Sequence, residues 1–277
     1  MEGIITAIKR GAVHDGDGLR TTVFFKGCPL KCIWCHNPEG ISPKPQTAKF
    51  PHLCMNCGTC GGKTTETAAE NCPTGALVTY GKAYTVESLL PQLLQDKAFF
   101  DNSGGGVTLS GGECLMQPEF AAALAKALWE AGIRVNIDTC GFVSQKALEG
   151  VLPYTDTFLY DLKAVDPAVH KACTGQENGP ILENLRYLSS RGCKIEIRYP
   201  LVMGYNDREC EKIGAFLQNM PGITRIKVLQ YHDFSVSRYQ ALAMENTMPA
   251  TTTTLQDVEK AVCTLRAYGL PAVGGNE

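Results

Sequence analysis

The 277-residue chain carries 26 Lys and Arg against 28 Asp and Glu, which leaves a net charge of −2. Hydrophobic residues make up 44% of the chain and charged residues 19%, which excludes a disordered protein and argues against a nucleic-acid binder that uses a broad basic surface. No apolar run reaches the roughly 18 residues of a membrane span, and the opening MEGIITAIKRG lacks a signal-peptide core. We therefore expect a cytoplasmic protein that does not enter a membrane.

The first predicted strand covers residues 21–25, and residues 26–80 then lose regular periodicity and become rich in Cys, Pro, Gly and Thr. From residue 84 the pattern predicts strands at 107–109, 133–138, 156–160, 194–199 and 224–229. It predicts helices at 86–100, 119–131, 144–150, 181–190, 207–220 and 255–268. Because strands and helices alternate about six times, we expect a parallel sheet with crossover helices, either a partial barrel or an open doubly wound sheet.

The 13 cysteines are unevenly distributed, with seven of them between Cys28 and Cys72. Their number is odd, and disulfides are rare in the cytosol. Metal binding or redox chemistry is therefore the favoured interpretation. The six later cysteines stand singly in regular elements, where buried small hydrophobic side chains are the default: Cys114, Cys140, Cys173, Cys193, Cys210 and Cys263.

The first cysteine group, Cys28, Cys32 and Cys35, has the spacing C-x3-C-x2-C and directly follows the first predicted strand. Three thiolates can hold three irons of a four-iron cluster. The absent fourth thiolate leaves one iron open to a substrate, as in catalytic rather than structural metal sites. The alternatives are a zinc site or three buried thiols.

The stretch GCPLKCIWCHNPEG at 27–40 resembles the loop that holds the iron–sulfur cluster in radical S-adenosylmethionine (SAM) enzymes. We call this stretch the cluster loop. More narrowly, it is similar to the activating enzymes of glycyl radical enzymes, relatives of the pyruvate formate-lyase activase. The preceding VHDGDGLRTTVFFKG resembles their opening, although Asp17 stands where the family has Pro. Further landmarks follow in order at 103–113, 138–142, 160–163, 170–188, 198–207 and 230–232. The resemblance covers almost the whole chain and implies a partial (β/α)6 TIM barrel.

The second cysteine group is Cys54, Cys57, Cys60 and Cys72, with Pro73 after the last cysteine. This spacing is similar to that of bacterial ferredoxins, although the last gap is longer. We expect one auxiliary [4Fe–4S] cluster, and a structural zinc is the alternative. The module would be an insert at 46–80 in a barrel formed by residues 1–45 and 81–277.

Several polar residues follow predicted strands, where ligands bind in α/β folds. Gly111 and Gly112 would let the backbone approach the cofactor, and Glu113 would meet its ammonium group. By resemblance, Asp138, Thr139 and Asp161 would form a monovalent-cation site for Na⁺ or K⁺ beside the SAM carboxylate, and Lys163 would offset a carboxylate. Ion pairing at the strand ends is the alternative.

The resemblance assigns the remaining cofactor contacts. Arg198 would approach the carboxylate side of SAM and His232 its ribose or methionine part. Trp34 and His36 would contact the cofactor from the cluster loop, with His36-Asn37 at the adenine. His14-Asp15 would lie at the barrel mouth, where Asp15 would help receive the partner's glycine loop, although a plain turn is an alternative.

The activity implied by the resemblance is reductive cleavage of SAM to methionine and a 5′-deoxyadenosyl radical. The radical would remove a hydrogen atom from a glycine of a partner glycyl radical enzyme, with flavodoxin or ferredoxin as the electron donor. Three alternatives remain: a radical SAM enzyme that acts on a metabolite, a ferredoxin-like electron carrier, and a zinc-binding structural module.

Overall fold

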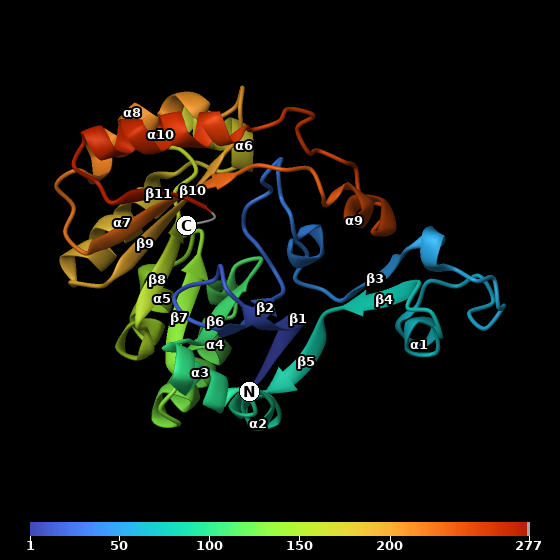
Figure 1. Cartoon of the computed structure of the whole chain (residues 1–277). Coiled ribbons are helices and arrows are strands. Elements are labelled where there is room, and N and C mark those ends of the chain that lie inside the picture. The colour runs from blue at the N-terminus through green and yellow to red at the C-terminus, as the bar shows by residue number, and fades with distance from the viewer. Residues whose placement is uncertain (276–277) are drawn as a thin grey trace.

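The computed structural model describes residues 1–275. Its main feature is a nine-stranded sheet (Figure 1). Parallel neighbours run from the edge strand β11 to β2, and β1 and β5 complete the sheet in antiparallel fashion. The spatial order is β11 (Ala272–Gly274), β10 (Ile223–Gln230), β9 (Ile195–Leu201), β8 (Thr157–Asp161), β7 (Arg134–Thr139), β6 (Gly106–Gly111), β2 (Arg20–Phe25), β1 (Glu2–Ala12) and β5 (Lys82–Thr85).

Helices connect the parallel strands in six strand–helix units, which confirms the predicted partial (β/α)6 barrel. The α-helices of these units are α2 (Val86–Leu94), α3 (Lys97–Ser103), α4 (Pro118–Glu130), α5 (Gln145–Val151), α6 (Pro167–Thr174), α7 (Gly179–Ser190), α8 (Cys210–Leu217) and α10 (Leu255–Ala267), and α9 (Val236–Ala241) lies between β10 and α10. Short 3-10 turns are η1 (Pro38–Gly40), η3 (Cys114–Met116), η4 (Leu152–Tyr154) and η5 (Asp207–Glu209). No helix within residues 1–275 has both the length and the apolar character needed to cross a membrane.

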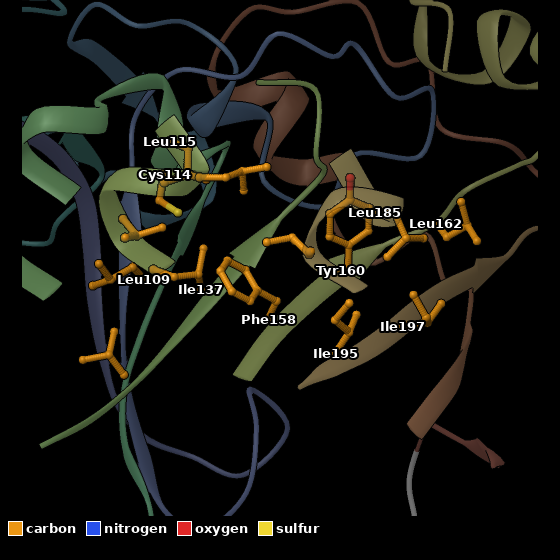
Figure 2. Close-up of a cluster of buried hydrophobic side chains, with 14 of the residues drawn as sticks. Leu109, Cys114, Leu115, Ile137, Phe158, Tyr160, Leu162, Leu185, Ile195 and Ile197 are labelled. Carbon is orange, nitrogen blue, oxygen red and sulfur yellow. The ribbon is translucent and has the colours of Figure 1, made fainter. Parts of the chain in front are cut away.

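Alternation along the strands gives the sheet one apolar and one polar face. On β9, Ile195 and Ile197 belong to the main hydrophobic core (Figure 2), while Glu196 and Arg198 are buried polar residues. On β7, Ile137 lies in the same core and Asn136 is buried and polar. The apolar face packs against the helices, so the inside of the barrel is lined by polar and charged groups.

The loop before β2, residues 13–19, crosses the inside of the barrel. Arg198 donates to the carbonyl of His14 over 2.8 Å, and Arg225 pairs with Asp17 over 2.8 Å. These arginines lie on β9 and β10, four and five places from β2 in the sheet order, so the sheet curves around the loop. His14 and Asp15 therefore lie inside the barrel, with Asp15 3.7 Å from Arg198. The expected role of Asp15 in receiving the partner's glycine loop stays a prediction.

A second, two-stranded sheet stands apart from the main one (Figure 1). It pairs β3 (Gln46–Lys49) with β4 (Leu77–Tyr80) in antiparallel register, Gln46 opposite Tyr80. Between them lie η2 (Pro51–Leu53) and α1 (Glu66–Glu70), whose N-terminus is capped by the Thr65 hydroxyl. Because Gln46 lies opposite Tyr80, the segment begins and ends at neighbouring positions in space.

Two helix predictions differ from the structure in informative ways. The helix predicted at 86–100 is two helices, because the chain turns at Asp96, whose carboxylate accepts hydrogen bonds from Thr21 and Arg10. The helix predicted at 207–220 begins with a 3-10 turn and ends at Leu217. The strand β1 and the helix α6 carried no periodicity that the sequence analysis recognised.

Candidate active site

A cavity of about 920 Å³ opens at the carboxyl ends of the parallel strands. This volume lies in the range of small-molecule sites, about 300–1,000 Å³. Of the predicted barrel-site residues, all except His14 and Glu113 line it: Asp15, Cys28, Cys32, Trp34, Cys35, His36, Gly111, Gly112, Asp138, Thr139, Asp161, Lys163, Arg198 and His232. Residues from distant parts of the sequence thus face one volume, because nearly all of them follow or end strands of the same sheet, whereas Asp15 precedes β2.

The cluster loop is held from two sides. The amides of Lys31 and Ile33 donate to Thr174 and Cys173 at the end of α6, both over 2.9 Å. The Tyr239 hydroxyl, from α9, donates to the carbonyl of Cys35 over 3.0 Å. These bonds give the three thiols a defined backbone despite the lack of regular structure in the loop.

The three thiols differ in their surroundings. Burial raises the pKa of Cys32 above its ordinary value and that of Cys35 to about 12, although a backbone hydrogen bond from Asn37 favours the Cys35 thiolate. A hydrogen bond from Cys140 lowers the pKa of Cys28. Burial therefore disfavours bare thiolates at Cys32 and Cys35, and their ionisation requires a bound cation.

The donor set fits an iron–sulfur cluster better than a single metal ion. Within residues 1–275, no three His, Cys, Asp or Glu side chains converge closely enough to hold one ion. The thiols of Cys28, Cys32 and Cys35 instead face the same large cavity from separate points of the loop. Soft thiolates spread around an open volume match the ligands of a four-iron cluster.

The glycine pair after β6 lines the cavity and also packs tightly beneath the cluster loop. Gly111 has a φ of +124°, and a Cβ there would collide with the backbone of Phe25. A Cβ on Gly112 would collide with the carbonyls of Gly27 and Gly40. Only glycine fits this close approach, so the pair brings the end of β6 against the loop that carries the thiols.

Glu113 is a predicted cofactor residue that the structure places behind the cavity wall. The side chain is fully buried behind the cavity wall and does not line the cavity. Its carboxylate accepts hydrogen bonds from the amides of Leu115 and Cys140, over 3.0 and 2.8 Å, and from the Thr139 hydroxyl over 2.8 Å. In this arrangement Glu113 holds residues 139–140, which do line the cavity, and its contact with the cofactor's ammonium group stays a prediction.

Three carboxylates and two cations share the inside of the cavity. Arg198 lies 3.7 Å from Asp15 and 3.4 Å from Asp138, and the Lys163 ammonium lies 2.6 Å from Asp161. Burial raises the pKa of Asp138 to about 6, against the opposing effect of Arg198. Burial alone would lower the pKa values of Arg198 and Lys163, but the neighbouring carboxylates raise them. Both cations therefore stay charged.

These ion pairs are the alternative that the sequence left open for Asp138, Thr139 and Asp161. The Thr139 hydroxyl is already used, since it donates to Glu113 and accepts from the amide of Gly141. Asp138 also accepts from the Ser110 hydroxyl over 2.6 Å. A monovalent cation at these residues stays a prediction.

Aromatic rings form one rim of the cavity. The ring of His36 stacks on that of His232 with 4.2 Å between centroids, and His232 stacks on Phe234 at 4.3 Å. Trp34 is buried in a small apolar cluster with Tyr231 and Tyr239. Phe234 is 81% exposed and was not predicted from the sequence, because a single Phe in a loop gives no signal there.

Two cysteines in regular elements show how position decides their role. Cys114 is fully buried in the core, as predicted. Cys140 lines the cavity and interacts with Cys28, which the sequence analysis missed. Its place in the family landmark at residues 138–142 was the available signal.

The four cysteines of the second group lie in the segment between β3 and β4, away from the barrel cavity. Three of their thiols contact side chains two residues away: Cys54 contacts Asn56, Cys57 contacts Thr59 and Cys72 contacts Thr74. The structure does not gather the four thiols around one point within the described residues. The auxiliary cluster stays a prediction.

Comparison with known proteins agrees with this geometry. The sequence profile of the Radical SAM superfamily matches residues 22–217. The chain is 36% identical to the choline trimethylamine-lyase activating enzyme of Oleidesulfovibrio alaskensis, over 98% of this chain and 97% of that protein. It is 35% identical to the trans-4-hydroxy-L-proline dehydratase activating enzyme of Clostridioides difficile, over 87% of this chain and 88% of that protein.

Solved structures show the same fold. A domain of a pyruvate-formate lyase-activating enzyme from Bacteroides vulgatus superposes with a TM-score of 0.52 at 28% identity, covering 61% of this chain and 98% of that one. Streptococcus suis SuiB superposes with a TM-score of 0.61 at 16% identity, covering 89% of this chain and 46% of that one, which supports the fold alone.

The fold, the thiol loop and the matching profile define a radical SAM enzyme. Within that superfamily the chain belongs to the activating enzymes of glycyl radical enzymes, as the sequence resemblance predicted.

Proposed function

We propose that this activase binds SAM in the barrel cavity, against a [4Fe–4S] cluster on Cys28, Cys32 and Cys35, and removes a hydrogen atom from a glycine of a partner glycyl radical enzyme. The observation that supports this most strongly is the convergence of three thiols and the strand-end charged residues on one cavity. A closed electron-transfer cluster would require a fourth thiolate and no such cavity.

Different residues of the chain would bind different parts of SAM. Arg198 offers a guanidinium to a carboxylate, and Asp138 and Asp161 offer carboxylates to an ammonium or a cation. Lys163 neutralises Asp161 within the cavity. His36 and His232 present a stacked aromatic surface beside the cluster loop, suited to a purine and its ribose.

The cluster would supply one electron, which cleaves a carbon–sulfur bond of SAM to give methionine and a 5′-deoxyadenosyl radical. That radical takes a hydrogen atom from the glycine Cα, so the products are 5′-deoxyadenosine and a glycyl radical on the partner. The barrel residues orient the nucleoside and exclude water, which protects the radical from side reactions.

Several finer assignments belong to the same proposal. Residues 46–80 form an insert with one auxiliary [4Fe–4S] cluster on Cys54, Cys57, Cys60 and Cys72, in a barrel of residues 1–45 and 81–277. The pairing of β3 with β4 at the two ends of the insert supports these bounds. We further propose Na⁺ or K⁺ at Asp138, Thr139 and Asp161, flavodoxin or ferredoxin as the electron donor, and a cytoplasmic location.

The test mixes reduced, reconstituted protein with SAM and a candidate glycyl radical enzyme under anaerobic conditions. We expect a doublet glycyl signal in electron paramagnetic resonance, with 5′-deoxyadenosine formed alongside it. A Gly→Ala change in the partner's loop is the matched control and should abolish the signal. If 5′-deoxyadenosine forms with a metabolite while no partner acquires a radical, the enzyme acts on a small molecule instead.

A further inference from the structure

A guanidinium from outside the barrel reaches the cluster loop. Arg238, on α9, places Nη1 2.8 Å from Glu39 Oε1, 3.0 Å from Asn37 Oδ1 and 3.2 Å from the carbonyl oxygen of His36. Three acceptors from one short stretch of the loop therefore converge on a single nitrogen. Because Nη1 carries two N–H donors, the three acceptors share them.

Glu39 holds the guanidinium in place. The residue is 7% exposed, one carboxylate oxygen pairs with Arg238, and the other has no hydrogen-bond partner within residues 1–275. The buried Lys26 donates to the Glu39 carbonyl over 2.6 Å and to Gln46 over 3.0 Å. Glu39 thus connects α9 and the cluster loop with β3, the first strand of the insert.

The same region grips the cluster loop at further points. The Thr247 hydroxyl donates to the carbonyl of Ile33 over 3.1 Å, and Tyr239 donates to that of Cys35. A ring nitrogen of His36 lies 2.8 Å from the carbonyl oxygen of His232. Of these contacts, only those of Arg238 reach the peptide that joins His36 and Asn37.

That peptide forms part of the cavity wall, since both residues line the cavity. A peptide bond is planar, so fixing the His36 carbonyl also fixes the direction of the Asn37 N–H on the other side of the plane. The orientation of the His36–Asn37 peptide therefore determines which backbone groups the cavity wall presents to a nucleoside.

We propose that Arg238 is a positioning residue that holds the His36–Asn37 peptide against the nucleoside half of SAM, and that Glu39 orients its guanidinium. The inference rests on the proposed function, because that function assigns the cavity to SAM. Arg238 itself does not touch the cofactor in this proposal, because its Nη1 atom bonds to the side of the cluster loop that faces α9.

The first experiment needs neither the cluster nor SAM. Amide hydrogen exchange is compared in the cluster-free wild type, Arg238→Ala and the control Arg208→Ala, since the exposed Arg208 side chain makes no hydrogen bond or ion pair within residues 1–275. The amides of Gly40 and Ile41, which bond to Asn37 and Pro38, should exchange faster in Arg238→Ala only. Equal exchange rates of these amides in the wild type and in Arg238→Ala would overturn the proposed positioning role of Arg238, whatever the enzyme's function.

The second experiment separates the two halves of the cofactor in the reconstituted protein. Arg238→Ala should raise the dissociation constant of SAM about tenfold, equivalent to about 1.4 kcal/mol, and leave that of free methionine within about twofold. Iron content should match the wild type. Arg238→Lys and Glu39→Gln should give intermediate losses, because each keeps part of the contact set.

Two results would overturn the proposal. One is SAM affinity unchanged in Arg238→Ala. The other is an equal loss for SAM and methionine with a fall in iron content, which would show that Arg238 supports the whole loop rather than the nucleoside wall. Failure of the wild-type protein to bind SAM would instead refute the proposed function, without bearing on the hydrogen-exchange result.

Discussion

Replacing Glu113 tests whether this buried carboxylate supports the cavity wall or meets the cofactor. In Glu113→Ala, the amides of Leu115 and Cys140 lose their acceptor within the protein interior. Each buried, unsatisfied donor costs about 1–3 kcal/mol, so the two cost about 2–6 kcal/mol. Relief from burying the carboxylate, whose pKa is raised by that burial, offsets part of this cost. We expect a net loss of about 2–4 kcal/mol in the free energy of unfolding.

The assay is thermal unfolding of cluster-free protein, followed by SAM titration after reconstitution. A loss of that size corresponds to a melting temperature lower by about 4–16 °C. Glu130→Ala is the control, because Glu130 is exposed on α4 and pairs with Lys126 only over 3.8 Å. It should change the free energy of unfolding by less than about 0.5 kcal/mol.

Glu113→Gln decides between the two roles, because it keeps the shape of the side chain. The NH2 group of the new side chain would face one of the N–H or O–H donors that the carboxylate accepts from, so the protein should still lose stability. SAM affinity should stay within about threefold. A variant that melts like the wild type but binds SAM more than about tenfold weaker would refute our reasoning and restore Glu113 as a cofactor-binding group.

Three further predictions concern metal content and ion pairs. Reconstituted protein should hold about eight irons, and the variant with Ala at Cys28, Cys32 and Cys35 about four; about four irons plus zinc in the wild type would remove the auxiliary cluster. Asp161→Ala should weaken SAM binding, and a higher potassium or sodium concentration should partly restore that binding. The change should also lower the free energy of unfolding, because the buried Lys163 loses its carboxylate partner. Losses in binding and stability that do not depend on the cation concentration would leave ion pairing as the only role of Asp161. Asp17→Asn should cost about 1 kcal/mol or less at pH 7, because the pair with Arg225 is exposed. The hydrogen bond from Arg225 lowers the pKa of Asp17, so this contribution should be lost as the pH falls through that lowered pKa, and a cost that persists at acid pH would contradict the pairing.

The sequence by itself was sufficient for the features that depend on spacing along the chain. The three thiols of the cluster loop lie within eight residues, Cys28 to Cys35, so their shared role can be read from covalent distance. The alternation of strands and helices predicted six strand–helix units. The carboxyl ends of parallel strands lie at the same edge of the sheet, so residues that follow different strands come together there. Asp138, Asp161, Arg198 and His232 line one cavity, and their contacts with the cofactor stay predictions.

Tertiary structure decided the roles that depend on which partners surround a buried polar group. Glu113 and Cys140 lie 27 residues apart in sequence, and their hydrogen bond exists only because β6 and β7 are neighbours in the sheet. Asp15 lies beside Arg198 because the sheet curves around the loop before β2. Arg238 reaches His36 across 202 residues. Propensity and periodicity report how a segment buries its apolar side, whereas the acceptor that a buried donor finds is set by contacts between distant segments, on which local sequence carries no information.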